Sequence, residues 1–347
     1  MKRFFRFLLI ATVFATTLVG CGSSGSPSEE ALSSSSGETS GVGNTVLNVA
    51  IQPSAAFVPL YVVKENGWLE DALEELGVTV NWTEFESGPP MNESFAAGQQ
   101  DIGVIGDVPS ITALAAGYDN TIVGIGAYGV EAYTLLVPSD SGIDSISGLK
   151  GKTIGLTVGS TAHNLVDKIL EANDLGINED VEIVNLSSGD LQTTLETEQV
   201  DAIATWEPNT TRITDNGTAV ILADGTGVLR GVNVIFGRTD YLAENPEVVK
   251  IFLEQYARGN KELRENTKET TEAITEYFSI SAEQLQKVIE KYHYTVTVTD
   301  EDIEELQSTS DFLVKIEAIE KGVNVSDYID TSYCDDADLA KYAVDEE

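Results

Sequence analysis

The sequence predicts an α/β protein of two lobes, each built on a sheet of repeated βα units. Three observations support this prediction. Apolar runs alternate with helical patterns in two successive series. An extended segment follows each series, at about 132–138 and at about 230–237. Charged helical sequence follows from 246 to 321. Alternating strands and helices are typical of a mostly parallel sheet with helices on both faces. We therefore expect two βα sheets joined by two crossover strands.

The first series begins at Thr45 with the apolar run TVLNVAI. Its helical patterns end at Gly67, Gly98 and Gly117, and glycine commonly follows the last turn of a helix. The expected strands are 45–51, 78–85, 101–106 and 121–127, and the expected helices are 57–67, 91–98 and 108–117.

The second series repeats this organisation after the first extended segment. Because ligands of open α/β sheets bind beyond the carboxyl ends of the strands, two hinged lobes place these ends on either side of a cleft. The expected strands are 152–158, 181–186, 200–206 and 218–223, and the expected helices are 160–173, 190–197 and one from about 208. We assign the first lobe to 45–137 with 236–347, and the second lobe to 138–235.

The first 44 residues are expected to lie outside both lobes. Residues 1–20 combine basic residues with an apolar run from Phe7 to Val19, which is shorter than the about 20 residues of a spanning helix and is typical of an export signal. The run ends at LVGC, which resembles the bacterial lipobox and implies a lipidated Cys21; a cleavable signal with an incidental cysteine is the alternative. Residues 22–44 are rich in serine and glycine and are interpreted as a flexible tether.

Charge and composition exclude several classes of function. The formal net charge is −37, which repels phosphate backbones and excludes nucleic acid as a partner. Cys334 is the only cysteine after Cys21, so the folded part can form no intrachain disulfide and no cysteine-rich metal site. The two histidines, His163 and His293, are far apart in the sequence. We expect neither a metal site nor a cofactor.

Small and polar residues follow four of the expected strands. In IGDVPS (105–110), Gly106 permits a turn and Asp107 is a good helix N-cap, so a plain strand-to-helix turn would explain these residues. Their recurrence favours a ligand site, because helix starts present free N–H groups and a partial positive charge. The other three strand ends are QPSAAF (52–57), ESGPP (86–90) and GSTA (159–162).

Three segments carry a family resemblance. The block FESGPPMNESFAAGQQDIGVIGDVPSITALAAG (85–117) resembles the sulfonate, taurine and nitrate group of solute-binding proteins of ABC importers. AIATWEP (202–208) and TIGLTVGSTAH (153–163) resemble motifs of their second lobe, and the resemblance extends over roughly 46–320. It implies a type II periplasmic binding protein clamshell, related to thiamine-precursor synthases. It also implies a lipid-anchored, monomeric receptor on the extracytoplasmic face of the cell membrane, with an ABC permease as partner.

The resemblance implies a cleft lined by residues of both lobes. Trp206 either closes over the ligand or packs in the lobe core, and Arg230 either binds an anion or pairs with one of many carboxylates. We interpret Glu207 as a helix N-terminal charge or a lobe-to-lobe contact, and His163 as facing solvent or the cleft rim, without a catalytic role. The candidate ligand-binding residues are Gln52, Ser54, Phe57, Gly88, Pro89, Gly106, Asp107, Tyr128, Ser160, Thr161, Trp206 and Arg230.

The leading hypothesis is a receptor for a small anion such as an alkanesulfonate, taurine or nitrate. The acidic chain slows the approach of an anion, although screening over about 8 Å at physiological salt limits this effect. A pyrimidine precursor of thiamine or a flavin-like ring is the alternative ligand. A related fold synthesises the pyrimidine precursor with a histidine and a cysteine-rich motif, which this chain lacks, so we do not expect an enzyme. A purely structural surface lipoprotein would have no ligand-sized cleft.

Overall fold

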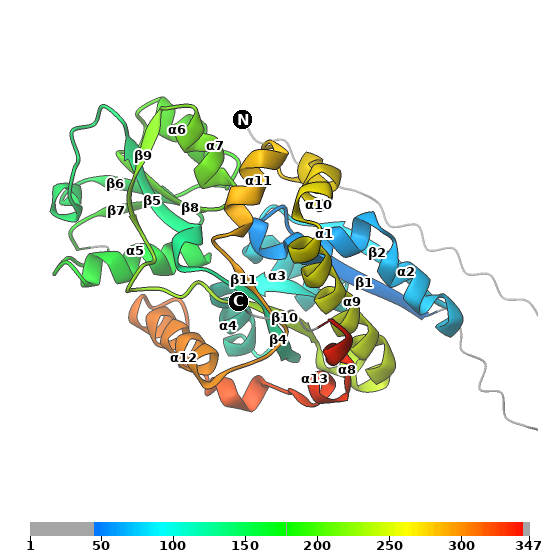
Figure 1. Cartoon of the computed structure of the whole chain (residues 1–347). Coiled ribbons are helices and arrows are strands. Elements are labelled where there is room, and N and C mark those ends of the chain that lie inside the picture. Colours follow the sequence, from blue (N-terminus) through cyan, green and yellow to red (C-terminus); the bar gives the residue numbers. More distant parts are fainter. Residues whose placement is uncertain (1–44, 178, 343–347) are drawn as a thin grey trace, which may run out of the picture. The chain divides into compact units, whose positions relative to one another are not determined.

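The structure, a computed structural model, describes residues 45–177 and 179–342 (Figure 1). The expected signal peptide (1–20), Cys21 and the expected tether (22–44) lie outside the described residues. Within them, the strands form two sheets, and each sheet is the centre of one lobe. None of the described helices is both long and apolar enough to span a bilayer.

The first lobe contains a sheet with the strand order β11-β4-β10-β3-β1-β2. Its continuous apolar strands are buried on both faces, as sheets covered by helices on both sides require. The strands are β1 (Thr45–Ile51), β2 (Val78–Glu84), β3 (Ile102–Gly106), β4 (Asn120–Tyr128), β10 (Asn233–Arg238) and β11 (His293–Tyr294). The α-helices of this lobe that precede β10 are α1 (Val58–Glu65), α2 (Trp68–Leu73), α3 (Gly88–Ala96) and α4 (Asp107–Ala115).

Helix α3 begins three residues earlier than the sequence pattern indicated. The expected start was residue 91, but the first turn includes Gly88, Pro89 and Pro90. Proline is well tolerated in the first turn, because the N–H that it lacks would have no partner within the helix.

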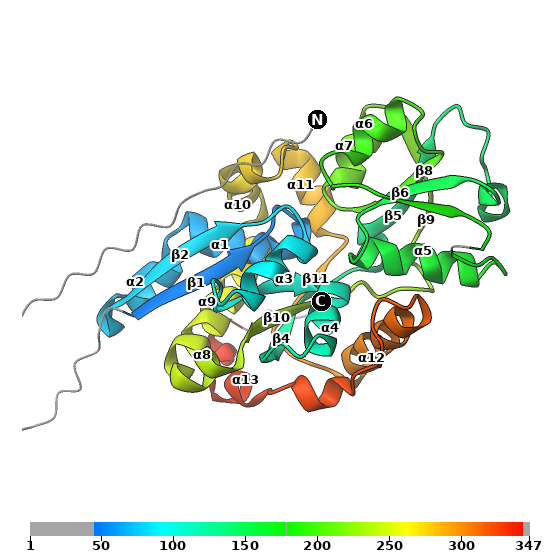
Figure 2. The ribbon, with the colours of Figure 1, turned by 180° about the vertical axis from the view of Figure 1, so that it is seen from behind.

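The second lobe contains a sheet with the strand order β7-β6-β8-β5-β9. Figures 1 and 2 show this lobe in green, with α5 along one side of the sheet and α6 and α7 on the other. The elements are β5 (Tyr133–Pro138), β6 (Thr153–Leu156), α5 (Thr161–Glu171), β7 (Glu182–Asn185), α6 (Leu191–Glu196), β8 (Ala202–Trp206), α7 (Asn209–Asp215) and β9 (Ala219–Asp224).

The two crossover strands run against their neighbours. β5 is antiparallel to β8 and β9, and β10 is antiparallel to β3 and β4, while β1, β2 and β3 are parallel and so are β6, β7 and β8. A strand that starts at the side of a sheet where the neighbouring strands have their carboxyl ends must run antiparallel to those neighbours. Both crossovers therefore lie at the carboxyl edges of the sheets.

This topology shifts the expected lobe boundaries by a few residues. β5 was expected to close the first lobe at 137, but it pairs within the second sheet. The start of β10 was assigned to the second lobe up to 235, but the whole strand pairs within the first sheet. The chain changes lobe just before Tyr133 and again just before Asn233, because each crossover strand belongs to the sheet that it enters.

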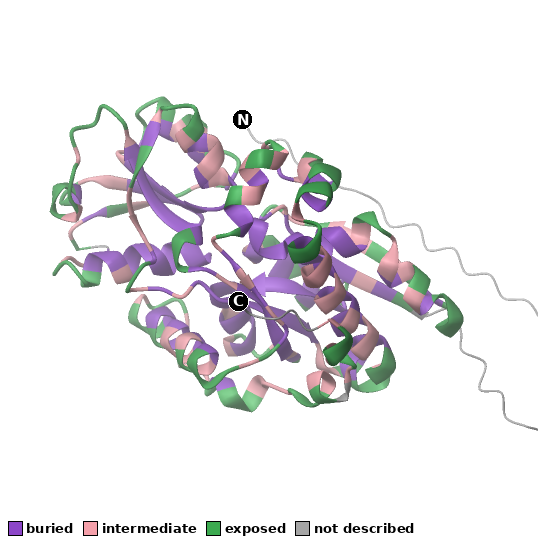
Figure 3. Cartoon of the chain, in the orientation of Figure 1, coloured by how far each residue is buried: buried purple, intermediate pink, exposed green. Residues whose placement is uncertain are grey.

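The helical C-terminal part returns to the first lobe. Leu306, Phe312 and Leu313 of α12 pack in the apolar cluster that also contains residues of α3 and α4. Figure 3 shows the buried strands of both lobes beneath helices whose outer faces are exposed. The helices after β10 are α8 (Thr239–Glu244), α9 (Pro246–Glu265), α10 (Thr267–Ile274), α11 (Ala282–Ile289), α12 (Asp300–Lys315) and α13 (Ser332–Asp336).

Candidate functional site

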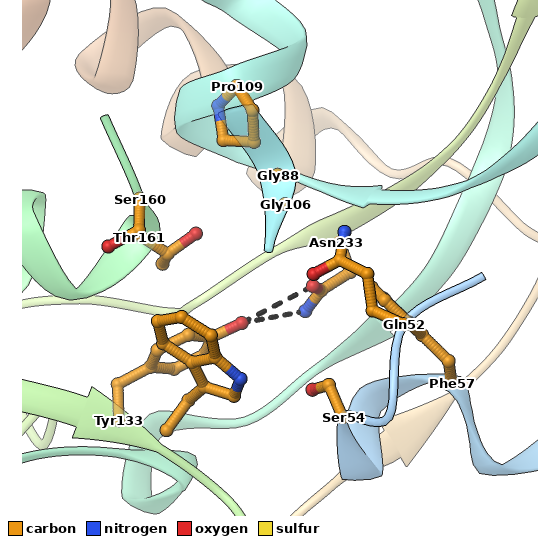
Figure 4. A pocket seen from close by; sticks show the side chains of 11 residues that line it. Gln52, Ser54, Phe57, Gly88, Gly106, Pro109, Tyr133, Ser160, Thr161 and Asn233 are labelled. Atoms are coloured by element: carbon orange, nitrogen blue, oxygen red, sulfur yellow. Dashed lines mark hydrogen bonds between the residues drawn. The ribbon is translucent and has the colours of Figure 1, made fainter. Parts of the chain in front are cut away.

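A small cavity lies between the two lobes, at the carboxyl edges of their sheets (Figure 4). Its volume is about 30 Å³. One water needs roughly 10–15 Å³ by this measure, so the cavity as it stands holds a group of only a few atoms. The lining residues are Gln52, Ser54, Phe57, Gly88, Gly106, Pro109, Tyr133, Ser160, Thr161, Trp206 and Asn233.

The two crossover strands contribute Tyr133 and Asn233, which the sequence analysis missed. Tyr133, the first residue of β5, pairs with Trp206 at the end of β8, and Asn233, the first residue of β10, pairs with Gly106 at the end of β3. The Tyr133 hydroxyl lies 3.0 Å from Nδ2 and 3.3 Å from Oδ1 of Asn233 (Figure 4). Their positions in the sequence could have identified them, because each is the first residue of a crossover strand and both strands begin at the cleft.

The segment after β1 provides polar and aromatic lining from the first lobe. Ser54 Oγ accepts from the N–H of Ala56 and so caps the short helix that contains Phe57. Gln52 Nε2 lies 3.1 Å from Sδ of Met91, a weak acceptor. The second N–H of the Gln52 amide is therefore available to a ligand.

Gly88 and Gly106 are needed for close packing rather than for unusual backbone angles. Gly106 has φ −65°, which any residue can adopt, so the expected role of glycine in the turn is wrong. A Cβ at Gly106 would lie 2.7 Å from Thr161 Oγ1, and a Cβ at Gly88 would lie 2.4 Å from Cγ of Pro109. The absence of a side chain at 106 is what allows the second lobe to approach.

Asp107 lies behind the cavity wall and is neither a lining residue nor the N-cap. The N-cap of α4 is Gly106, and Asp107 is the first helical residue, fully buried. Its Oδ1 accepts from Thr161 Oγ1 at 2.5 Å and its Oδ2 accepts from Thr309 Oγ1 at 2.6 Å. The N-cap prediction is wrong because two hydroxyl groups from other elements engage the carboxylate. Burial raises the pKa of Asp107, although these hydrogen bonds oppose the shift.

Helix α5 is the helix start best placed to donate to a ligand. Ser160 and Thr161 both line the cavity, and the Ser160 hydroxyl donates to the carbonyl of Thr157. The first N–H groups of a helix have no acceptor within it, so those of Thr161 and Ala162 are free for an anionic or polar group. Prolines remove such donors from the first turns of α3 and α4.

Pro89 does not line the cavity. It lies in a separate surface hollow of about 180 Å³ that also includes Gly159 of the second lobe. Gly88, the first residue of α3, lies at the cavity, whereas Pro89, the second, lies against Gly159.

Trp206 lines the cavity and is 8% exposed, and the next residue joins the lobes. The fully buried Glu207 carboxylate accepts from the N–H and hydroxyl of Thr211 in α7 and from Nζ of Lys291 in the first lobe. Its backbone carbonyl accepts from the N–H of Ala55. Both interpretations of Glu207 are confirmed: its carboxylate lies at the N-terminus of α7, and it also contacts the other lobe through Lys291.

Arg230 and Tyr128 do not line the cavity. The Arg230 guanidinium pairs with Glu301 at 2.5 Å and Asp302 at 3.1 Å, and it lies 3.6 Å from the centre of the Tyr128 ring. The ion-pair interpretation of Arg230 therefore describes the structure, and the ligand interpretation does not. The sequence could not distinguish them, because only the fold brings the N-terminus of α12 to this arginine.

Further polar contacts join the two lobes outside the cavity lining; we call them the rim contacts. α12 and α5, side by side in Figures 1 and 2, supply two of them. His163 is buried against Phe312 of α12 rather than facing solvent, and burial lowers its pKa to about 4. The rim contacts are Lys315–Asp167, Lys168–Ser308, Lys291–Glu207 and Glu86 with Ser188 and Gly189.

The cavity itself is electrically neutral. Among the described residues, no lysine, arginine, histidine, aspartate or glutamate lines it. No group of three or more potential metal ligands occurs among the described histidine, cysteine and acidic side chains. The lining residues can therefore donate and accept hydrogen bonds and present aromatic faces.

Comparison with known sequences gives one family and several relatives. The model of the NMT1/THI5-like family matches residues 54–270. A protein of Bacillus subtilis (strain 168), provisionally named aliphatic sulfonates-binding protein, is 31% identical over 328 residues, which cover 94% of each chain. A protein of Escherichia coli (strain K12) with the same provisional name is 25% identical over 248 residues, 71% of this chain and 77% of its own.

Solved structures share the fold. The alkanesulfonate-binding protein SsuA from Xanthomonas axonopodis pv. citri, bound to MOPS, is 25% identical with a TM-score of 0.75, covering 82% of this chain and 98% of its own. The desulfurization enzyme DSZB is 16% identical with a TM-score of 0.66, covering 86% of this chain and 100% of its own, a likeness of fold alone. The expected two-lobed type II binding-protein fold and the resemblance to sulfonate-binding proteins are confirmed.

Proposed function

Because this chain belongs to the NMT1/THI5-like family, we propose that it is the solute-binding receptor of an ABC importer and that its ligand is a small organic anion, first of all a sulfonate. The relatives with provisional sulfonate-binding names support this class of ligand. The receptor would deliver the ligand to the permease by opening its lobes.

The observation that carries the proposal is the small cavity between the lobes, with uncharged donors from both. Thr161 of α5 and Gln52 of the segment after β1 line the same small volume, whereas the two N–H groups of the Asn233 amide donate to Tyr133 and Gly231. A head group with several acceptor oxygens would therefore contact both lobes at once through Thr161 and Gln52. Such a ligand stabilises closure because it contacts both lobes when they are together and only one of them when they part. A sulfonate offers three acceptor oxygens and fits uncharged N–H and O–H donors.

The aromatic lining favours one alternative ligand class. Phe57, Tyr133 and Trp206 could hold a pyrimidine ring, but the cavity volume of about 30 Å³ requires the lobes to stand further apart around any ring. An enzymatic function finds less support, because the relatives are named as binding proteins. The Thr161 hydroxyl lies beside the Asp107 carboxylate, but none of the described histidines or cysteines lines the cavity. Nitrate and taurine remain in the same class as the proposed ligand, since each has acceptor oxygens on a small head group.

A thermal-shift screen with ethanesulfonate, taurine, nitrate, a pyrimidine and riboflavin tests the proposal. A ligand at 100 times its Kd stabilises the folded form by about 2.7 kcal/mol. Ethanesulfonate should raise Tm, and small-angle scattering should show a more compact molecule. Trp206→Ala should lose the shift, whereas Trp82→Ala, whose indole donates to Glu70 away from the cavity, should keep it. A shift with riboflavin but not with any anion would refute the anion proposal.

We further propose that Cys21 carries the lipid anchor that holds the receptor outside the cell membrane. The support is the sequence LVGC after the apolar run and the serine- and glycine-rich segment that follows it. Stable anchoring requires two acyl chains, which a lipoprotein N-terminus provides. Cys21→Ser should move the protein from the membrane fraction to the soluble fraction. Native protein with an unmodified N-terminus at Gly22 or beyond, seen by mass spectrometry, would contradict this proposal.

A further inference from the structure

We propose, on the basis of the proposed function, that Asp107 takes up one proton when an anion binds and so turns the Thr161 hydroxyl from an acceptor into a donor toward the ligand. Asp107 is a positioning residue in this scheme, because it touches Thr161 and not the cavity. The consequence is that anion binding strengthens as the pH falls.

The geometry places one hydroxyl between the carboxylate and the cavity. Thr161 lines the cavity, and its Oγ1 lies beside Gly106, another lining residue. The same Oγ1 donates to Asp107 Oδ1 at 2.5 Å. While Asp107 is ionised, the only hydroxyl hydrogen of Thr161 is used in this bond, and the oxygen can offer the cavity nothing but lone pairs. An anion therefore meets an acceptor where it needs a donor.

Protonation of Asp107 reverses this polarity. A proton from solvent binds Oδ1, and the new O–H donates to Thr161 Oγ1. The Thr161 hydroxyl hydrogen then rotates toward the ligand, while Oδ2 continues to accept from Thr309. No bond other than hydrogen bonds is broken, and one proton is taken up for each anion bound.

The charge distribution favours this uptake. Asp107 is fully buried and no cationic side chain lines the cavity among the described residues, so a bound anion would add a second negative charge to an uncompensated region. Like charges near a buried carboxyl favour its neutral form. Burial already raises the pKa of Asp107 in the ligand-free protein.

Neighbouring titratable groups do not supply the missing positive charge. Arg230 is paired with Glu301 and Asp302, and Lys168 donates to Ser308. Burial, followed by the Asp107 charge, raises the pKa of Glu305. The titratable and charged groups around Asp107 are Tyr133 of β5, His163 and Lys168 of α5, Arg230 of the segment before β10, and Asp302 and Glu305 of α12.

Calorimetric titration of the protein with ethanesulfonate between about pH 5 and 8 tests the proposal. The sulfonate does not titrate in this range. Within the window between the pKa values of Asp107 in the free and bound protein, Kd should rise about tenfold per pH unit. Titrations in buffers of different ionisation enthalpy should show the uptake of up to one proton per ligand. This measurement needs no substitution.

Three variants assign the proton to its residue. Asp107→Asn keeps a donor toward Thr161 and an acceptor for Thr309, so it should bind with the low-pH affinity at every pH and take up no proton. Glu305→Gln should keep the slope, which separates Asp107 from its acidic neighbour. Asp101→Asn should also keep it: Asp101 is buried at the opposite end of β3 and its pKa is also raised by burial, but it contacts Asn48 and Arg238.

The outcomes separate the two proposals. Ethanesulfonate binding that is independent of pH and takes up no proton overturns the role of Asp107 and leaves the receptor function intact. A slope that persists in Asp107→Asn also overturns it. If neither the original protein nor Asp107→Asn binds ethanesulfonate at any pH, this inference is overturned together with the proposed sulfonate ligand.

Discussion

The two lobes meet in two zones with opposite chemistry. Around the cavity the described lining residues are uncharged, and the donors are hydroxyl, amide, indole and backbone groups. A short distance away, the rim contacts include two lysine–carboxylate pairs, Lys291–Glu207 and Lys315–Asp167, in which each carboxylate is buried. In a chain with 20 lysines and arginines against 57 acids, cations are scarce, and the rim contacts use three of them, Lys168, Lys291 and Lys315, to join the lobes.

This difference indicates a division of roles. The rim contacts attract the lobes whatever the cavity contains, and their strength does not depend on the charge of the ligand. The cavity selects by size and hydrogen bonding, because uncharged donors are directional and a misplaced polar group buried without a partner is costly. Substitutions at the rim should therefore change closure for every ligand, whereas substitutions at the cavity should change closure according to the ligand's shape.

The largest effect is expected from removing the lysine of the buried rim pair. Lys291→Met leaves the Glu207 carboxylate, 0% exposed, without its cation in the closed form. Breaking a buried pair in this way costs roughly 3–5 kcal/mol. In the open form the carboxylate regains water, so the cost falls on closure. Ethanesulfonate affinity measured by calorimetry should fall by about two orders of magnitude or more.

Lys287→Met is the matched control for this prediction, since Lys287 is an exposed lysine of the neighbouring helix α11. Its affinity should stay within about twofold of the original protein, as for most surface substitutions. Equal losses in the two variants would show that overall charge, and not the Glu207 pair, controls closure.

Acidification should weaken the α5–α12 contact through His163. The pKa of His163 is lowered from 6.5 to about 4 by burial, so the folded form holds it neutral while the unfolded chain protonates first. Its contribution is present above pH 6.5 and is lost as the pH falls from 6.5 to about 4. The shift corresponds to about 3 kcal/mol. Denaturation by urea across this pH range measures it.

His163→Gln should flatten this pH dependence, and His293→Gln should preserve it. These are the two histidines of the sequence, so the pair forms a complete test of the assignment. The interpretation of a buried neutral His163 fails if the pH dependence follows His293.

A smaller effect is expected from a single methyl group at the cavity. In Gly106→Ala the new Cβ would lie 2.7 Å from Thr161 Oγ1, closer than packed atoms allow. Overpacking of this kind costs about 1–3 kcal/mol. Ethanesulfonate affinity should fall about fivefold to 150-fold, and scattering should show a less compact liganded form. Gly148→Ala is the control, because Gly148 lies in an exposed short 3-10 helix of the second lobe (Ile146–Leu149) and the nearest atom to a new Cβ would lie at 3.4 Å. The same loss there would contradict the steric explanation.

The smallest effect is expected at the exposed end of the rim. Asp167 is 2% exposed, as Glu207 is 0%, but Lys315 is 46% exposed against 24% for Lys291, so water and salt screen this pair more and we expect it to contribute about 1 kcal/mol. Lys315→Met should lower ethanesulfonate affinity by less than about fivefold, and the difference should disappear in about 1 M salt, where the Debye length is about 3 Å. A loss that exceeds tenfold and resists salt would place this pair among the strong rim contacts.

Much of the fold and part of the site could be predicted from local sequence. The apolar runs located the strands. Eight of the twelve candidate residues line the cavity, because they end or follow strands whose carboxyl ends face the cleft. The exceptions have physical reasons. Asp107 is turned away by the hydroxyls of Thr161 and Thr309, and Pro89 lies against Gly159 in a separate hollow.

Contacts distant in sequence decided the remainder. Whether Arg230 binds a ligand or a carboxylate depends on α12, which begins 70 residues later in the chain. The role of His163 depends on Phe312 of the same helix, and Tyr133 and Asn233 meet only because the two crossover strands start at the same edge.

The sequence by itself determined the two βα series, the crossover strands, the acidic charge and the motif at 85–117 that indicates the family, because periodicity, composition and local turns are properties of neighbouring residues. Only the tertiary structure decided which polar groups face the cavity and which are used between the lobes. The physical reason is that a donor has few hydrogens to give. Whether that of Thr161 reaches a ligand depends on a carboxylate 54 residues away in the sequence, and no local pattern records that choice.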